Sequence, residues 1–220
     1  MPRAEARDVR VEHDLLGERE IPAHAYWGVH TLRAVENFPI TGRWIGLWPE
    51  LVRALALVKH AAAQTNYELG LLDETKAKLI IAACREIADG ALHDEFVVDM
   101  IQGGAGTSTN MNANEVIANR ALELAGRKKG DYAFLHPIEH VNMAQSTNDV
   151  YPTALRLALR FAIVDLIAAM EELKVAFAAK SVEFRDLLKV GRTQLQDAVP
   201  MTLGQEFSTF AVMLGEDQQR

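Results

Sequence analysis

The chain has 220 residues, of which 49% are hydrophobic, and this is enough to bury the core of one or two domains. Its net charge is −7, which argues against nucleic acid or an anionic membrane as a partner. The single cysteine, Cys84, excludes an internal disulfide framework and a cysteine-rich metal site. Cys84 lies in the apolar run LIIAACREIA, which indicates a buried structural thiol rather than a nucleophile.

The N-terminal residues, MPRAEARDVRVEHD, contain no apolar core of the kind that signal peptides have, and no stretch reaches the apolar length of a membrane span. We therefore expect a soluble cytoplasmic protein. Residues 1–7 are expected to form a frayed tail, and Val9–Ile21 a small β-hairpin with Gly17 between its strands. A short helix is expected at His30–Asn37, followed by a loop rich in glycine and proline.

Helical patterns then dominate the chain. Pro49 stands in the first turn of a predicted helix that ends at Gly70. Its predicted buried face comprises apolar residues that recur every three or four positions, Leu51, Leu55, Val58 and Ala62. Asp73 is the predicted N-cap of a second helix, which ends at Gly90.

A third helix is expected at Asn110–Ala125, and residues 126–142 are expected to form a basic turn and loop. From Pro152 a helical pattern continues to about Phe184 without glycine or proline, and such a helix is roughly 50 Å long. This length is typical of a helix bundle. We expect a polar loop at residues 189–201 and a further helix from about Thr202, which the sequence leaves without a closing segment.

The predicted fold is therefore mainly α. Residues 1–145 are expected to form an N-terminal, mainly helical domain with a small β-hairpin, and residues 146–220 the first long helices of a central helix bundle. Because the last helix has no closing segment, we expect the sequence to be the front part of a longer protein.

The segment Gly103–Glu115, which reads GGAGTSTNMNANE, is the first indication of chemistry. Its glycines allow backbone N–H groups to approach a ligand closely. The hydroxyl and amide side chains that follow stand at a predicted helix N-terminus, which favours an anion. The segment contains no lysine, so it is not a Walker-type phosphate loop, and its neutral donors suit a small carboxylate.

Two further polar segments lie at helix boundaries. Ser146, Thr147 and Asn148, in QSTNDVYPTA, precede the long helix, although such residues also form ordinary N-caps. Thr193 and Gln194 lie in GRTQLQDAVPMTLGQE, which taken alone is equally well a solvated loop. Three donor-rich segments, all at helix boundaries, favour one shared site.

These three segments, together with the opening DLLGEREIPAHAYWGVHTLRAVENF, resemble the fumarase/aspartase superfamily. The resemblance covers nearly the whole chain in the right order. Fumarases typically carry GTQSNMN, QSSND and GRTHLQDA, whereas this chain has GTSTNMN, QSTND and GRTQLQDA. At all three positions where this chain differs from fumarases, its sequence resembles that of the members that deaminate L-aspartate. Glutamine at position 194 can only donate and accept hydrogen bonds, so it is expected to orient the substrate rather than to act as an acid or base.

The resemblance implies reversible deamination of L-aspartate to fumarate and ammonia, with no cofactor and no metal ion. It implies that a base removes a proton beside the side-chain carboxylate and that fixed donors stabilise the dianionic carboxylate that forms. The substrate-binding residues implied on the carboxylate side are Thr107, Ser146 and Thr147. Those implied on the amino side are Asn148, Thr193 and Gln194.

The resemblance also implies a homotetramer in which each active site draws on three subunits. The family's base, a serine on a GSS loop, and a carboxylate-binding lysine are expected beyond Arg220, so the chain alone is expected to be inactive. Two alternatives stay open: a fumarate hydratase of the same superfamily, and a non-catalytic helical scaffold that keeps the fold.

The roles of the neighbouring polar residues are expected to be mainly structural. Asn110, Asn112 and Asn114 are expected to support loops and packing, and Arg192 to form an ion pair or to bind a carboxylate. Residues 136–140, HPIEH, stand where fumarases often carry a second carboxylate-binding loop that reads HPND. This departure argues against a second site here.

Overall fold

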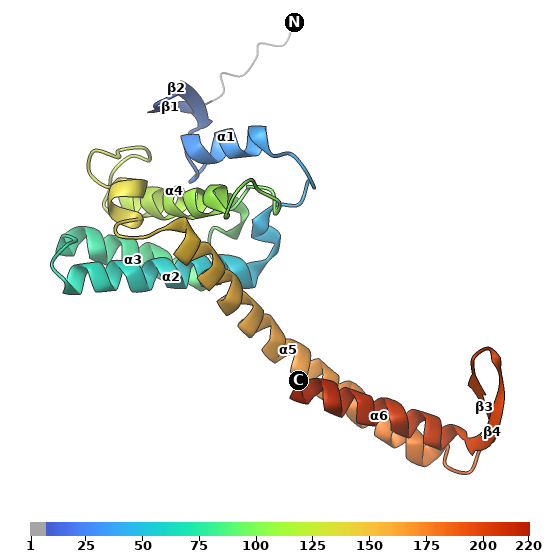
Figure 1. Cartoon of the computed structure of the whole chain (residues 1–220). Coiled ribbons are helices and arrows are strands. Elements are labelled where there is room, and N and C mark those ends of the chain that lie inside the picture. The colour runs from blue at the N-terminus through green and yellow to red at the C-terminus, as the bar shows by residue number, and fades with distance from the viewer. Residues whose placement is uncertain (1–7) are drawn as a thin grey trace, which may run out of the picture. The chain divides into compact units, whose positions relative to one another are not determined.

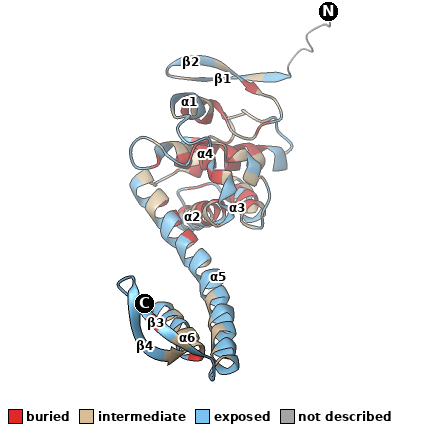
Figure 2. Cartoon of the chain, turned by 90° about the vertical axis from the view of Figure 1, so that its right-hand side faces the viewer, coloured by how far each residue is buried: buried red, intermediate tan, exposed pale blue. Residues whose placement is uncertain are grey.

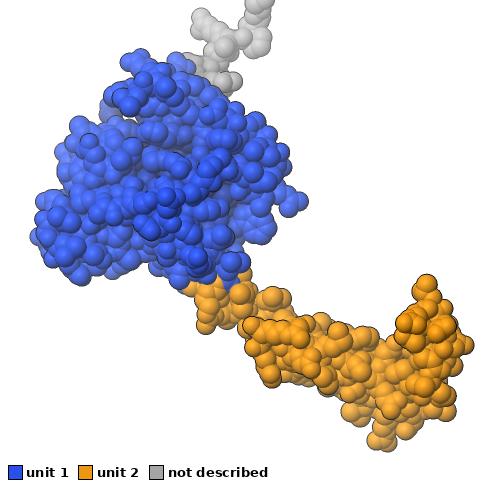
Figure 3. Space-filling view, viewed as in Figure 1, with its two compact units in different colours: residues 1–159 blue, residues 160–220 orange. Residues whose placement is uncertain are grey.

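The computed structural model describes residues 8–220, and the tail predicted at residues 1–7 lies outside the described residues. Two compact units make up the chain, residues 1–159 and residues 160–220 (Figure 3). The boundary between them falls within the long helix α5 (Thr147–Glu183). The domain boundary predicted between residues 145 and 146 lies next to the first residue of this helix, Thr147. The division into two domains at that point stays a prediction.

The first unit begins with the predicted hairpin, in which β1 (Val9–Asp14) pairs antiparallel with β2 (Gly17–Pro22). Gly17 has a φ of +112°, a backbone conformation that glycine adopts without steric cost. Four α-helices of this unit follow in chain order, namely α1 (Val29–Asn37), α2 (Pro49–Glu68), α3 (Glu74–Ala88) and α4 (Thr107–Leu124) (Figure 1). Short 3₁₀ turns at Ile45–Leu47 and His93–Glu95 lie between these helices, and a π-helical turn at Pro137–Val141 follows α4.

The ends of α2 and α3 follow local sequence signals and confirm the predictions. Pro49 occupies the first turn of α2, where its missing N–H has no intrahelical partner to lose. The Asp73 carboxylate accepts hydrogen bonds from the N–H groups of Thr75 at 2.9 Å and Lys76 at 3.1 Å, so it is the N-cap of α3. Gly90 follows α3 with a positive φ, as helix-terminating glycines do.

The core of the first unit lies between α2, α3 and α4, where buried residues gather (Figure 2). Cys84 on α3 is buried there, and burial raises the pKa of its thiol to about 12, which confirms a structural thiol. The predicted buried face of α2 was partly wrong, because Leu51, Val58 and Ala62 are only half-buried. The residues of α2 that are buried are Val52, Ala54, Leu55, Ala56, Lys59, Ala63 and Asn66.

The second unit contains the rest of α5, the strands β3 (Leu188–Thr193) and β4 (Gln196–Thr202), and α6 (Leu203–Gln219). The polar loop predicted at residues 189–201 is wrong, because these residues form an antiparallel hairpin. Its turn, Gln194–Leu195, has positive φ values at two non-glycine residues, so the usual glycine signal of such a turn is missing from the sequence. The last helix does begin after Thr202, which forms a capping box with Gln205.

Two helices begin earlier than predicted. α4 begins at Thr107 instead of Asn110, and α5 begins at Thr147 instead of Pro152. Pro152 is the sixth residue of α5, where it cannot donate the backbone hydrogen bond that another residue would make to the carbonyl of Asn148. Residues 137–141 are helical within the segment predicted as a loop. The predicted mainly α fold with a small N-terminal hairpin is confirmed. Along residues 8–220, no helix combines the length and apolar character needed to span a membrane.

Candidate functional site

The glycine-rich segment leads directly into α4 and packs against α5. Gly106 has a φ of +83°, and a Cβ atom there would lie 2.5 Å from the ring of Tyr151 in α5. Only glycine fits both the backbone conformation and the space. Thr107, the first residue of α4, is exposed. The N-terminus of α4 therefore lies beside the first turns of α5.

The start of α5 presents two hydroxyl groups that each accept one hydrogen bond from the protein. Ser146 Oγ accepts a hydrogen bond from the backbone N–H of Asn148 at 3.2 Å, so Ser146 caps the helix. Thr147 Oγ1 accepts a hydrogen bond from Asn110 Nδ2 at 3.1 Å. A hydroxyl that accepts one hydrogen bond still has its own hydrogen to donate. Both hydroxyls can thus donate to an external acceptor at a helix N-terminus, where an anion is favoured.

Asn142 connects α4 to the turn before α5. Its Oδ1 atom accepts hydrogen bonds from Asn110 Nδ2 at 3.0 Å and Asn114 Nδ2 at 3.3 Å, and its Nδ2 donates to the backbone oxygen of Gln145 at 3.0 Å. These contacts confirm the structural role expected of Asn110 and Asn114. Asn112, also as expected, holds a loop, because its Nδ2 donates to the backbone oxygen of Glu95 at 3.0 Å.

A buried lysine that sequence reasoning missed lies beneath the same turn. Lys59 on α2 is 0% exposed, and its Nζ donates to Asn142 Oδ1 at 2.8 Å and to Gln145 Oε1 at 3.0 Å. Burial lowers the pKa of its ammonium group to about 7. The available sequence signal was a lysine at four-residue spacing from Leu55 and Ala63 on an otherwise mostly apolar helix face.

Thr193 and Gln194, the remaining predicted substrate-binding residues, belong to the second unit. Thr193 ends β3, Gln194 lies in the hairpin turn, and both are exposed. Arg192 pairs with Asp197 across the hairpin, with 3.2 Å between Nε and Oδ1, so the structure shows the first of the two roles expected for it. The first unit thus brings Thr107 and residues 146–148 to two adjacent helix starts, while Thr193 and Gln194 are presented on a separate hairpin.

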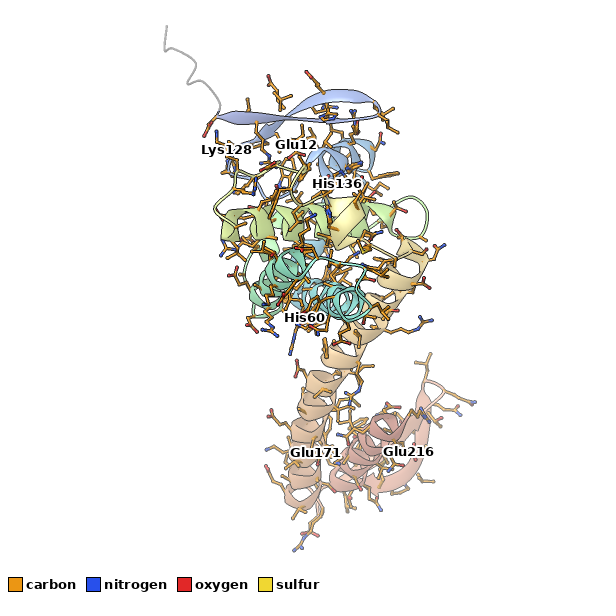
Figure 4. All side chains as sticks on the ribbon, turned by 90° about the vertical axis from the view of Figure 1, so that its left-hand side faces the viewer. Glu12, His60, Lys128, His136, Glu171 and Glu216 are labelled. Atoms are coloured by element: carbon orange, nitrogen blue, oxygen red, sulfur yellow. The ribbon has the colours of Figure 1, made fainter. Side chains whose placement is uncertain are left out.

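A second residue that the sequence did not reveal, Glu115 of α4, positions the start of α1. Its side chain is fully buried and accepts hydrogen bonds from the backbone N–H groups of Gly28 at 2.8 Å and His30 at 2.9 Å, and from Thr31 Oγ1 at 2.6 Å. The hydrogen bond with Glu115 raises the pKa of His30. A nearby buried carboxylate, Glu12, points from β1 toward the same helix start and accepts from the N–H of Val29 at 2.9 Å (Figure 4).

The backbone amides that begin the segment 136–140 are already paired within that segment. His136, labelled in Figure 4, uses its Nδ1 atom to accept from the backbone N–H groups of Ile138 at 3.1 Å and Glu139 at 3.3 Å. The N–H of His136 itself donates to His140 Nδ1 at 2.8 Å. The amides that begin this turn are therefore occupied by side chains of the same segment. Among residues 8–220, no group of three or more histidine, cysteine, aspartate or glutamate side chains is placed to hold a metal ion.

The arrangement in the first unit is suited to binding an anion with neutral donors. Two helix N-termini, the hydroxyls of Ser146 and Thr147, and the ammonium group of Lys59 beneath them all favour negative charge. Fixed donors of this kind stabilise a carboxylate whose charge increases during a reaction.

Comparison with known proteins identifies the family of this chain. The pattern of a family described as Lyase matches residues 17–220. The chain therefore belongs to this lyase family, within the fumarase/aspartase superfamily.

Several relatives of the chain are named aspartate ammonia-lyase. The chain is 61% identical over 215 residues to the aspartate ammonia-lyase of Pseudomonas fluorescens, covering 98% of this chain and 45% of that protein. It is 54% identical over 213 residues to that of Escherichia coli K12, covering 96% of this chain and 45% of the relative. The chain thus spans a little under half the length of these relatives.

Solved structures of the superfamily share the fold. The fumarate lyase:delta crystallin of Brucella melitensis aligns with a TM-score of 0.93 and 59% identity, covering 96% of this chain and 49% of that one. The class II fumarase of Schistosoma mansoni aligns with a TM-score of 0.84 and 36% identity, covering 96% of this chain and 44% of that one.

Proposed function

We propose that this chain supplies part of the active site of an aspartate ammonia-lyase, which converts L-aspartate reversibly to fumarate and ammonia. The observation that carries the proposal is the pair of adjacent hydroxyls on Ser146 and Thr147. Each accepts a hydrogen bond from the protein, and each has its hydrogen left to donate at the start of α5. Identities of 54–61% to aspartate ammonia-lyases support the choice of reaction.

The proposed reaction begins when a base removes a proton from the carbon beside the side-chain carboxylate. The electron pair of that C–H bond moves into the carboxylate, which becomes a dianion. Thr107, Ser146 and Thr147 donate hydrogen bonds to its oxygens and lower the barrier, as an oxyanion hole does. The pair then forms the carbon–carbon double bond as the C–N bond breaks and ammonia leaves.

The amino side of the substrate is assigned to Asn148, Thr193 and Gln194. Glutamine has no titratable proton near neutral pH, so Gln194 orients the amino group and transfers no proton. We place the base serine and a carboxylate-binding lysine in sequence beyond these 220 residues. The active form is proposed to be a cytoplasmic homotetramer in which each site combines segments of three subunits.

The shared-site proposal is supported by apolar side chains that α5 and α6 leave uncovered. Leu166 and Val175 on α5 and Val212 and Met213 on α6 are each 57% or 58% exposed within this chain. Exposed apolar side chains in this number favour association with further helices. Sedimentation velocity on the longer protein described next tests this, and a monomer would contradict it.

The function is tested with a joined enzyme, defined as residues 1–220 of this chain followed by the part of the Pseudomonas fluorescens relative that lies beyond its match. Formation of fumarate from L-aspartate is followed by ultraviolet absorbance. We expect turnover by the joined enzyme, none by the 220-residue chain alone, and faster reaction of L-aspartate than of L-malate. A preference for malate would identify a hydratase instead, and a folded joined protein without turnover of either would indicate a non-catalytic scaffold.

A further inference from the structure

Lys59 is a buried cation that the proposed reaction does not use. It lies on the buried face of α2 with Leu55 and Ala63, and within residues 8–220 it forms no ion pair with a carboxylate. Burial of an ammonium group without a carboxylate partner is unfavourable for folding. A position that carries such a group is a candidate for a functional role.

The contacts of Lys59 are with the turn that leads into α5. Its Nζ donates to the side chains of Asn142 and Gln145, at 2.8 and 3.0 Å. Asn66, on the same face of α2, donates from Nδ2 to the backbone oxygen of Met143 at 2.9 Å. α2 therefore holds three of the four residues that precede Ser146.

The turn held in this way has a backbone conformation that needs support. Ala144, which lies between the held residues, has a φ of +56°. The left-handed region is unfavourable for a residue with a Cβ atom, and such conformations persist where surrounding contacts enforce them. The hydrogen bonds from Lys59 and Asn66 to the flanking residues provide that enforcement.

The same contacts extend to the two hydroxyls of the proposed site. Asn142 Oδ1, which accepts from Lys59, also accepts from Asn110 Nδ2, and Asn110 Nδ2 donates in turn to Thr147 Oγ1 at 3.1 Å. Gln145, the other acceptor, directly precedes Ser146 in the chain. Lys59 is therefore connected to Ser146 through Gln145, and to Thr147 through Asn142 and Asn110.

We propose that Lys59 is a positioning residue for the dicarboxylate site: it fixes the turn that presents Ser146 and Thr147 and places a positive charge beneath them. This inference rests on the proposed function of that site. Lys59 is fully buried, so it acts through Asn142 and Gln145 and not by contact with substrate.

The charge of Lys59 changes near neutral pH, because burial lowers its pKa to about 7. The titratable group whose charge acts on it is Cys84 on α3, and the pKa of that thiol is raised to about 12, so it stays neutral. The side chains that Lys59 contacts directly are neutral amides. As pH rises through 7, Lys59 loses its charge, and the site is expected to bind a dicarboxylate more weakly.

The positioning role is tested first on the 220-residue chain by hydrogen exchange, which needs no enzymatic activity. In Lys59→Met, the amides of Gln145, Asp149 and Val150, which donate within the turn and the first turn of α5, should exchange about tenfold faster. Lys78→Met, at an exposed lysine of α3, is the matched control and should leave their exchange unchanged. Unchanged protection in Lys59→Met would overturn the proposal.

The charge is tested in the joined enzyme with succinate as a competitive dicarboxylate probe and L-aspartate as substrate. In Lys59→Met, we expect about tenfold to a hundredfold lower kcat/KM and a similar weakening of succinate inhibition. The pH dependence of succinate inhibition between pH 6 and 8 should disappear, which loss of packing alone would not cause. Lys59→Arg keeps a charge at every pH tested, so the succinate inhibition that it retains should lack that pH dependence.

Wild-type kinetics in Lys59→Met, or an unchanged pH dependence, would overturn the assignment. If the joined enzyme without substitutions does not convert L-aspartate, that result refutes the proposed function and not the role of Lys59 in the turn. The hydrogen-exchange result still decides whether Lys59 holds the turn.

Discussion

Replacing Lys59 with methionine is expected to make the first unit more stable at pH 6 and no more stable, or less stable, at pH 10. Methionine has a similar length and no charge, so the substitution removes the buried ammonium group while largely filling its space. If the hydrogen bonds of Lys59 contributed more to stability than its buried charge costs, the substitution would instead lower the free energy of unfolding at pH 6.

The expected magnitude follows from the pKa of Lys59. Burial lowers it from 10.5 to about 7, and since one pKa unit corresponds to about 1.4 kcal/mol, the charged form destabilises the fold by about 5 kcal/mol below pH 7. The unfolded chain binds the proton more tightly, so the free energy of unfolding rises between about pH 7 and pH 10.5. Near pH 10 the remaining penalty is about 1 kcal/mol.

The substitution also has a cost. Gln145 Oε1 loses the hydrogen bond from Lys59, whereas Asn142 Oδ1 keeps those from Asn110 and Asn114. One buried acceptor left unpaired costs about 1–3 kcal/mol. We therefore expect Lys59→Met to stabilise the unit by about 2–4 kcal/mol at pH 6, and this gain to shrink by about 4 kcal/mol at pH 10.

The assay is urea unfolding followed by tryptophan fluorescence. All three tryptophans, Trp27, Trp44 and Trp48, belong to the first unit, so the signal reports on it alone. Lys78→Met, at the exposed ion pair with Glu74, is the control and should change stability little at either pH. An effect of Lys59→Met that is the same at pH 6 and pH 10 would refute the reasoning that a buried charge is the source.

Three further predictions concern the site and its supports. Ser146→Ala in the joined enzyme should lower kcat/KM for L-aspartate by about a hundredfold, and near-unchanged kinetics would contradict its role as a donor. Gly106→Ala should destabilise the first unit by about 1–3 kcal/mol, because φ is +83° there and the Tyr151 ring fills the space; urea unfolding measures this, and an unchanged midpoint would contradict the contact. Glu115→Gln should destabilise the unit by about 3 kcal/mol, because a buried acceptor of several hydrogen bonds loses its charge. It should also lower the pKa of His30, which NMR titration detects, and an unshifted His30 would show that Glu115 is not the cause.

Helix ends with a local chemical cause were readable from the sequence. Asp73 caps α3 through the N–H groups two and three residues later, and Pro49 begins α2 for reasons confined to one turn. The hairpin of β3 and β4 was missed because its turn, at Gln194, contains no glycine or asparagine to mark positive φ. The early start of α5 was missed because the predicted helix begins at Pro152, whereas residues 147–151 already belong to it.

The sequence by itself determined the helical class, the family motifs and the identity of the hydroxyl donors, because each depends on residues close together in the chain. Only the tertiary structure showed which buried residues hold those donors and the neighbouring helix starts in place. Lys59 meets Asn142 across 83 positions and Glu115 meets Gly28 across 87, so no local pattern distinguishes either residue from an ordinary charge on a helix. Their burial and their hydrogen-bond partners exist only once α2, α4 and the turn before α5 have packed together.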